Sequence, residues 1–170
     1  MNKILILLFV LLVLSPKLIF AMRINEIMYD VAGTDTGREW IEIYNNTGNS
    51  IDFSKWKVLE NAVNHSVKII SGASIIPAGG YAIIADNDVN FLADNPNFAG
   101  VLFDSAFSLT NTIGETISLI DPSGNKVDEI TYSESIGAKG DGNSLQLHEG
   151  FLIAAKPTPG FENETKTSEA

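Results

Sequence analysis

Residues 25–30 (NEIMYD) and residues 38–45 (REWIEIYN) flank a loop rich in Gly, Thr and Asp, and this stretch decides the fold. Short segments of alternating polarity on either side of such a loop are typical of neighbouring β-strands. Successive side chains of a strand point to opposite faces, so Ile41 and Ile43 share one face of the second segment. We expect these two isoleucines to lie in the core.

The rest of the chain continues this all-β pattern, because short apolar runs alternate with turns rich in Gly, Asn, Asp and Pro. Trp56 and Val58 share one face of a predicted strand, and Ile117 and Leu119 share one face of another, so these four residues join the predicted core. Segment 86–99 is less regular and is predicted to hold one short helical turn as it crosses between sheets. Strands are predicted near residues 22–29, 39–46, 55–60, 66–71, 80–85, 100–103, 114–120, 126–132 and 144–148. The fold class is therefore all-β, a β-sandwich of about eight or nine strands.

The first 21 residues are predicted to be a signal peptide. Lys3 precedes an unbroken apolar run over residues 4–14, and Ala21 supplies a small residue at the end of the segment. A positive start, an apolar run of about 7–15 residues and a small residue at the cleavage point define secretory signals. The alternative is a retained anchor, although Lys17 interrupts the segment before it reaches the length of a spanning helix. We expect a secreted or cell-surface protein that contacts the membrane only if this segment is retained.

The chain carries a net charge of −10 and contains no cysteine. Residues 1–21 hold two lysines and no acid, so their removal leaves a net charge of −12. An acidic chain without a basic stripe repels phosphate backbones, and nucleic acid is therefore not an expected partner. The absence of thiols excludes cysteine catalysis, thiolate zinc sites and iron–sulfur clusters, and the fold must be held by packing alone.

Several sequence blocks occur in the order found in lamin tail domains, and the chain resembles this family over about residues 23–163. The blocks are residues 40–45 (WIEIYN), 51–58 (IDFSKWKV), 76–81 (IPAGGY), 107–111 (FSLTN), 115–119 (ETISL), 127–132 (VDEITY) and 156–163 (KPTPGFEN). The resemblance implies an immunoglobulin-like β-sandwich over residues 22–163, in a bacterial, exported, stand-alone copy of the domain. It points to a scaffold or binding module. The polar residues 164–170 are predicted to form a disordered tail.

Residues with catalytic potential are few. The chain has two histidines, His65 and His148, and no Gly-x-Ser-x-Gly sequence. A Ser-His-Asp site needs a histidine oriented by a carboxylate and an exposed serine. Glycoside hydrolysis needs two opposed carboxylates, and no pair is singled out among the 21 acids. We therefore predict that the protein is not an enzyme.

Asp86, Asp88 and Asp94 are the candidate metal ligands, because they bring carboxylates together in an irregular segment. Calcium takes about six to eight oxygen ligands and tolerates irregular loops, although this spacing does not match an EF-hand. The alternative is an acidic, solvated loop. Calcium is the one cofactor that the sequence suggests.

Trp40, Glu42 and Tyr44 are the candidate binding residues, because they share the face of their strand that is opposite to the two core isoleucines. Exposed aromatic side chains around a charge suit the recognition of proteins or sugars. The alternative is that segment 86–99 or a neighbouring strand covers them. These features favour a secreted, non-catalytic binding, adhesion or structural module for a protein or surface polymer. The alternatives are a hydrolase-associated domain and a calcium-stabilised domain that binds carbohydrate or nucleic acid.

Overall fold

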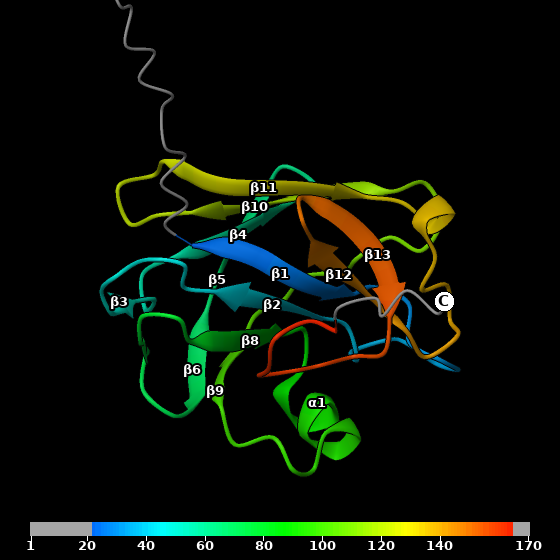
Figure 1. Ribbon diagram of the computed structural model, residues 1–170, viewed down its shortest axis with the longest axis horizontal. Helices are drawn as coiled ribbons and strands as arrows, with labels where there is room; N and C mark the ends of the chain where they lie inside the picture. Colours follow the sequence, from blue (N-terminus) through cyan, green and yellow to red (C-terminus); the bar gives the residue numbers. More distant parts are fainter. Residues whose placement is uncertain (1–21, 165–170) are drawn as a thin grey trace, which may run out of the picture.

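The computed structural model describes residues 22–164, so the predicted signal peptide and residues 165–170 of the predicted tail lie outside the described part. A seven-stranded sheet and a four-stranded sheet form most of the fold (Figure 1). The larger sheet has the spatial order β13 (Phe151–Ala155), β12 (Ser144–His148), β1 (Arg23–Met28), β2 (Trp40–Tyr44), β8 (Tyr81–Ala85), β9 (Val101–Asp104) and β6 (Lys68–Ser71). The smaller sheet has the order β11 (Lys126–Tyr132), β10 (Glu115–Ile120), β4 (Lys57–Glu60) and β5 (Val63–Ser66). The remaining elements are the pair β3 (Ile51–Asp52) and β7 (Ile75–Ile76), the helix α1 (Asp88–Asp94) and the 3-10 helix η1 (Glu134–Ile136).

The two large sheets share one apolar core, to which both contribute side chains. The six core residues predicted from the sequence are all buried there, at 7% exposure or less: Ile41, Ile43, Trp56, Val58, Ile117 and Leu119. Trp56 lies just before β4 and stacks on Phe53 at a ring-centroid distance of 5.1 Å. Burial of one large apolar side chain stabilises a fold by about 1.5–3 kcal/mol. Packing of this extent explains how a chain without disulfides holds its two layers together.

The connection from β8 to β9 corrects the prediction for residues 86–99. These strands are parallel neighbours in the seven-stranded sheet, and α1 lies between them in the sequence. Parallel neighbours cannot be joined by a tight turn and need a crossover connection. The side chain of Asn87 caps α1 by accepting the backbone N–H of Asn90 at 3.0 Å, and Phe91 is buried. The segment therefore returns to the same sheet instead of crossing to the other one.

The sequence predicts nine of the strands and misses β3, β5, β7 and β13. β3 and β7 have two residues each, and β5 (VNHS) has no apolar alternation. β13 (FLIAA) is apolar at every position, so period-2 reasoning gives no signal there. Glu164, which the sequence places in the tail, donates its backbone N–H to the side chain of Gln146 at 3.0 Å.

The turn between β4 and β5 contains a strained residue that provides a test of the fold. Asn61 and Ala62 have φ angles of 48° and 62°, and Ala62 is exposed. The left-handed region costs a residue with a Cβ about 1–2 kcal/mol, and glycine adopts it freely. We predict that Ala62→Gly raises the free energy of unfolding by about 1 kcal/mol, measured by denaturant unfolding.

Ala78→Gly is the matched control for that change. Ala78 is also an exposed turn residue, but its φ is not positive. Glycine there relieves no strain and adds entropy to the unfolded chain, so stability should stay equal or fall. Stabilisation of the same size by both changes would contradict the turn geometry.

Candidate functional site

The outer face of β2 is covered at Trp40 and Glu42, so these two residues do not form an exposed binding surface. Trp40 is covered by segment 86–99, as the alternative prediction has it. Trp40 is only 3% exposed, and the ring of Phe91 from α1 packs edge-on against it at a centroid distance of 5.9 Å. Helix α1 therefore closes a second, smaller apolar cluster on this face of the sheet. The predicted binding surface is not formed at Trp40, because an element about fifty positions further along the chain folds back over it.

Glu42 is fully buried beneath residues 156–164, which we call the C-terminal strap. One carboxylate oxygen accepts the backbone N–H of Gly160 at 2.6 Å, and the other accepts the Asn25 side-chain N–H at 2.8 Å. Burial raises the pKa of Glu42 to about 8, against the opposing effect of these hydrogen bonds, and the neighbouring Glu26 adds to the rise. Glu42 therefore holds the strap and is not presented to solvent.

Glu26 lies opposite Glu42 on β1 and holds the same strap. Its carboxylate accepts the backbone N–H of Thr158 at 3.1 Å and the Thr158 hydroxyl at 3.0 Å, and it also accepts the Ser144 hydroxyl. Burial raises the pKa of Glu26, although all of these donors oppose the rise. Sequence reasoning missed this pair, and the signal was available: a carboxylate in the middle of an apolar strand needs buried donors.

Tyr44 is half-buried at the margin of the covered face. Its ring lies 4.8 Å from that of Tyr81, and the guanidinium of Arg23 lies 4.8 Å from its ring centroid. These groups line a small cleft of about 180 Å³ together with His148. Of the three predicted binding residues, Tyr44 borders this cleft, and Trp40 lines a separate hollow of about 240 Å³ beside Arg38 and Asp94.

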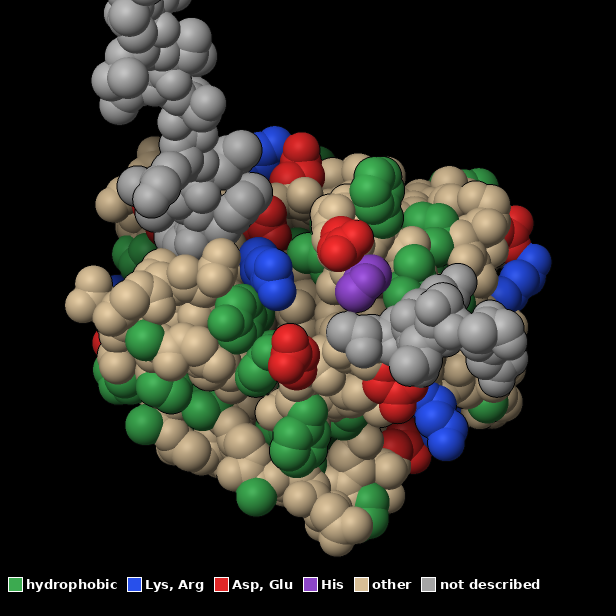
Figure 2. All heavy atoms as spheres, viewed as in Figure 1, with side chains coloured by type: hydrophobic (Ala, Val, Ile, Leu, Met, Phe, Trp, Pro, Cys, Tyr) green, Lys and Arg blue, Asp and Glu red, His purple; other side chains and the backbone are tan. Residues whose placement is uncertain are grey.

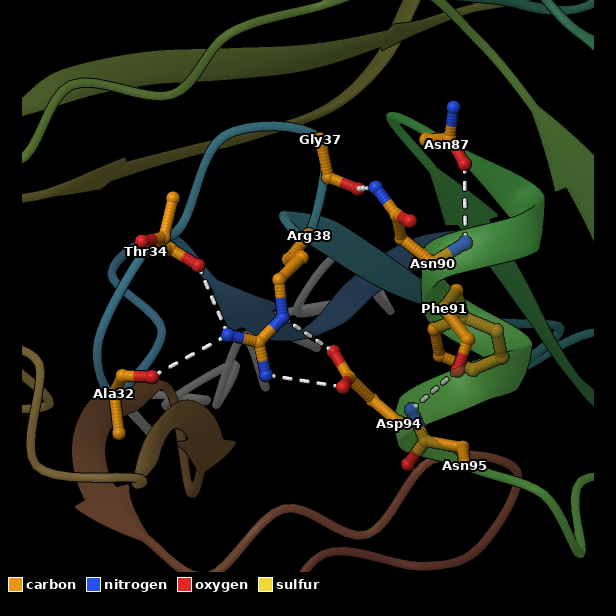
Figure 3. A network of polar contacts seen from close by, with 9 residues as sticks. All are labelled: Ala32, Thr34, Gly37, Arg38, Asn87, Asn90, Phe91, Asp94 and Asn95. Carbon is orange, nitrogen blue, oxygen red and sulfur yellow. Dashed lines mark hydrogen bonds and ion pairs between the residues drawn. The ribbon is translucent and has the colours of Figure 1, made fainter.

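The three candidate metal ligands are placed apart and are engaged elsewhere. Asp94 forms a bidentate ion pair with Arg38, at 2.7 Å and 3.0 Å (Figure 3). Asp88 begins α1, and the carboxyl of Asp86 accepts backbone N–H groups of Gly37 and Phe107. Within residues 22–164, no group of three His, Cys, Asp or Glu side chains is placed to hold a metal ion.

Figure 3 shows the contacts that join α1 to the loop that carries Arg38. Arg38 also donates to the backbone carbonyl of Thr34 at 2.9 Å, and Asn90 donates to that of Gly37 at 3.0 Å. These contacts tie the loop between β1 and β2 to the helix that covers Trp40. Asp94 and Asn90 of α1 thus help to fix the position of a covering element.

A second group of buried carboxyls lies in the smaller sheet. His65 is 3.0 Å from the carboxylate of Glu60, and the Tyr132 hydroxyl donates to Glu115 at 3.2 Å. Burial, together with a hydrogen bond to the neighbouring Glu60, raises the pKa of Glu115 to about 7. His65 is thus paired with a carboxylate, but no serine hydroxyl is bonded to it among the described residues.

An apolar-lined cleft opens between the edge strands β11 and β13 and has a volume of about 580 Å³. Ile130 and Ile136 line one side, and Leu147 and Leu152 line the other. Phe151 stands at its margin and is 75% exposed. A concave apolar site with a few polar groups is the usual form of a ligand site in proteins. We therefore take this cleft as the candidate functional site.

Three charged side chains line the polar part of the cleft: Arg23, Asp128 and Glu129. Asp128 accepts the backbone N–H of Ile24 at 2.7 Å, which ties β11 to the start of β1. Burial raises the pKa of Asp128, and this N–H opposes the rise. The Nε atom of Arg23 is buried and has no hydrogen-bond partner among the described residues. Arg23 also lines the small cleft beside Tyr44, so the two hollows adjoin.

The chain belongs to the lamin tail domain family, because the family model for the Lamin Tail Domain matches residues 21–134. The fold is consistent with that assignment, since it is a mostly antiparallel β-sandwich with one short α-helix. A search of curated proteins finds no match. What is identified in the chain is a non-catalytic domain. The strands β12 and β13, which form one wall of the cleft, lie beyond the matched range.

The described residues include no helix with the length and apolar character needed to span a bilayer.

The buried carboxyls predict an unusual dependence of stability on pH. Burial raises the pKa of both Glu39 and Glu42 from 4.5 to about 8. Between pH 4.5 and pH 8 the folded state then binds more protons than the unfolded state. The stability of the fold is therefore greatest near pH 4.5 and falls as the pH rises towards 8. Each group contributes a slope of at most about 1.4 kcal/mol per pH unit. Denaturant unfolding at a series of pH values from 4.5 to 8 measures this decline.

Glu39→Gln should make that decline shallower. The amide oxygen can still accept the Leu109 backbone N–H, which now reaches Glu39 at 2.7 Å, but the side chain no longer titrates. Glu149→Gln, at an exposed turn, is the matched control and should leave the slope unchanged. An equal slope in Glu39→Gln and in the unaltered protein would contradict the assignment.

Proposed function

We propose that this lamin tail domain is an exported, non-catalytic binding module that takes an extended, apolar polypeptide segment in the cleft between β11 and β13. The observation that carries the proposal is the cleft itself. Its volume of about 580 Å³ falls within the range of about 300–1,000 Å³ that is usual for ligand sites. Its walls are largely apolar, and one of them follows β11 over residues 128–131, which suits an extended chain better than a compact ligand.

The charge around the cleft favours a polypeptide with basic residues beside its apolar ones. Asp128 and Glu129 line the cleft, and Glu149 and Glu162 line the adjoining small hollow, against one positive side chain, Arg23. Lys and Arg side chains are dispersed over the face seen in Figure 2. A net charge of −10 and this dispersion argue against a nucleic-acid ligand, whose affinity depends on clustered cations.

Export is the second part of the proposal, and it is supported by the apolar run and small final residue of residues 1–21. We predict that the protein recovered after expression of the full chain in a bacterium begins at Met22. N-terminal sequencing or intact mass measurement checks this. Recovery of the intact chain in the membrane fraction would instead identify residues 1–21 as an anchor.

The binding proposal predicts a specific loss of affinity in Phe151→Ser. A large aromatic side chain at the margin of an apolar site is a typical binding hot spot, so its loss should weaken capture of cleft-binding peptides by at least about tenfold. A library of immobilised short peptides, probed with labelled protein, provides the measurement. Panels of polysaccharides and of DNA on the same surface test the two other ligand classes.

Phe161→Ser is the matched control, because Phe161 is 72% exposed, close to the 75% of Phe151, and lies outside the cleft. Both changes remove an exposed aromatic ring, so neither should affect folding. Equal losses in both variants would indicate non-specific apolar binding. Capture of polysaccharide without capture of any peptide would overturn the choice of ligand.

A further inference from the structure

The free edges of the two large sheets differ in how well they are protected. β6 and β11 each carry charged residues, Lys68 on the first and Lys126 and Glu129 on the second, and each has an irregular register with its neighbour. β5 (VNHS) is short and polar. Charges, bulges and short polar edges are the devices by which proteins prevent a sheet from adding strands.

β13 has none of these devices. Its five residues (FLIAA) are apolar, and its register with β12 is regular from end to end. Phe151 is 75% exposed, and Ile153 packs against neither apolar cluster. Figure 1 shows β13 at the margin of its sheet, and no strand of residues 22–164 pairs with its outer side. An uncharged, regular edge of this kind is a site of association.

The register determines which backbone groups of β13 are free. Glu149 and Gly150, with φ angles of 48° and 89°, form a two-residue turn that makes His148 and Phe151 a hydrogen-bonded pair. Hydrogen-bonded and non-bonded pairs alternate along an antiparallel ladder. The backbone N–H and C=O groups of Leu152 and Ala154 therefore face away from β12. These groups are available to another strand.

We propose that β13 pairs antiparallel with β13 of a second copy of this chain, about a two-fold axis that passes beside Ile153. In this register Leu152 lies opposite Ala154 of the second copy, so the free backbone groups of both strands meet. Ile153 lies opposite its own counterpart as a non-bonded pair, where side chains approach most closely. The pairing joins the two seven-stranded sheets into one continuous sheet and places Phe151 opposite Ala155 of the second copy.

The charges at the ends of β13 favour a second copy of this chain as the partner of this edge. They also favour an antiparallel pairing of the two strands. Glu149 precedes the strand and Lys156 follows it, and both are exposed. Antiparallel self-pairing places the acidic end of each strand beside the basic end of the other. A parallel arrangement would place like charges together, which is destabilising.

The interface is small, because it consists mainly of one five-residue strand from each copy. Stable protein interfaces bury about 1,200–2,000 Å², and a single strand pair falls short of that area. We therefore expect a weak, reversible dimer whose population rises with protein concentration. This inference is independent of the ligand that the cleft takes.

A cysteine at position 153 tests the register directly, because the chain has no cysteine of its own. Non-bonded antiparallel pairs have Cα atoms about 4.5 Å apart, which lies in the range that a disulfide spans. Ile153→Cys, made in the full chain and oxidised by air, should form a disulfide-linked dimer on a non-reducing gel. Thr131→Cys, on the neighbouring edge strand β11, is the matched control and should remain largely monomeric.

Sedimentation velocity over a range of concentrations tests the unmodified protein. The dimer should appear as the concentration rises, weaken in Glu149→Lys and return in the double variant Glu149→Lys with Lys156→Glu. Equal cross-linking of the two cysteine variants would overturn the register. A chain that remains monomeric up to about 1 mM, where a contact of only about −4 kcal/mol is half formed, would overturn the dimer and leave β13 open to a strand of another protein.

Discussion

The buried carboxyl groups of Glu26 and Glu42 are the constraint on which the rest of the structure depends. They lie opposite each other on neighbouring central strands, and both side chains are fully buried. A buried carboxylate without hydrogen-bond donors is costly, because it has lost its water. The donors come from the C-terminal strap, through Thr158 and Gly160. The C-terminal strap is therefore part of the fold, and the hairpin of β12 and β13 that precedes it is held in place with it.

The sequence predicts the inner face of the sandwich well and the outer face poorly, for a physical reason. Ile41 and Ile43 alternate with polar or amphipathic residues, and alternation reports which face of a strand meets the opposite sheet. It does not report whether a later segment covers the second face. Trp40 is covered by Phe91, about fifty residues further on, and Glu42 by Gly160, more than a hundred residues further on. Contacts at that separation leave no periodic signal in either segment.

The predicted metal ligands are not brought together, for a related reason. Asp86, Asp88 and Asp94 are close in sequence, but α1 contains two of them and points their side chains in different directions. Asp94 pairs with Arg38. The cleft was not predicted because β13 was not predicted, and a uniformly apolar strand carries no period. The one pointer in the sequence is the block at residues 156–163, which resembles a closing motif of the family although it lies beyond the matched range of residues 21–134. The contacts of this block define the C-terminal strap, and the strap follows directly after β13, which forms one wall of the cleft.

Strand β13 takes part in both the proposed ligand site and the proposed dimer. The cleft has β13 as one wall, so pairing of β13 with its own copy sets two clefts on either side of one two-fold axis. A weak interface and a shallow apolar site each give a low affinity when taken alone. A ligand that carries two apolar segments would bind the second cleft as an intramolecular step, and such coupling can exceed either single affinity by a factor of about 10²–10⁴. Ligand and dimer would then stabilise each other by mass action, because the doubly bound ligand favours the paired form over the single chain. A domain with no catalytic step could in this way discriminate a surface that displays many copies of a segment from the same segment free in solution.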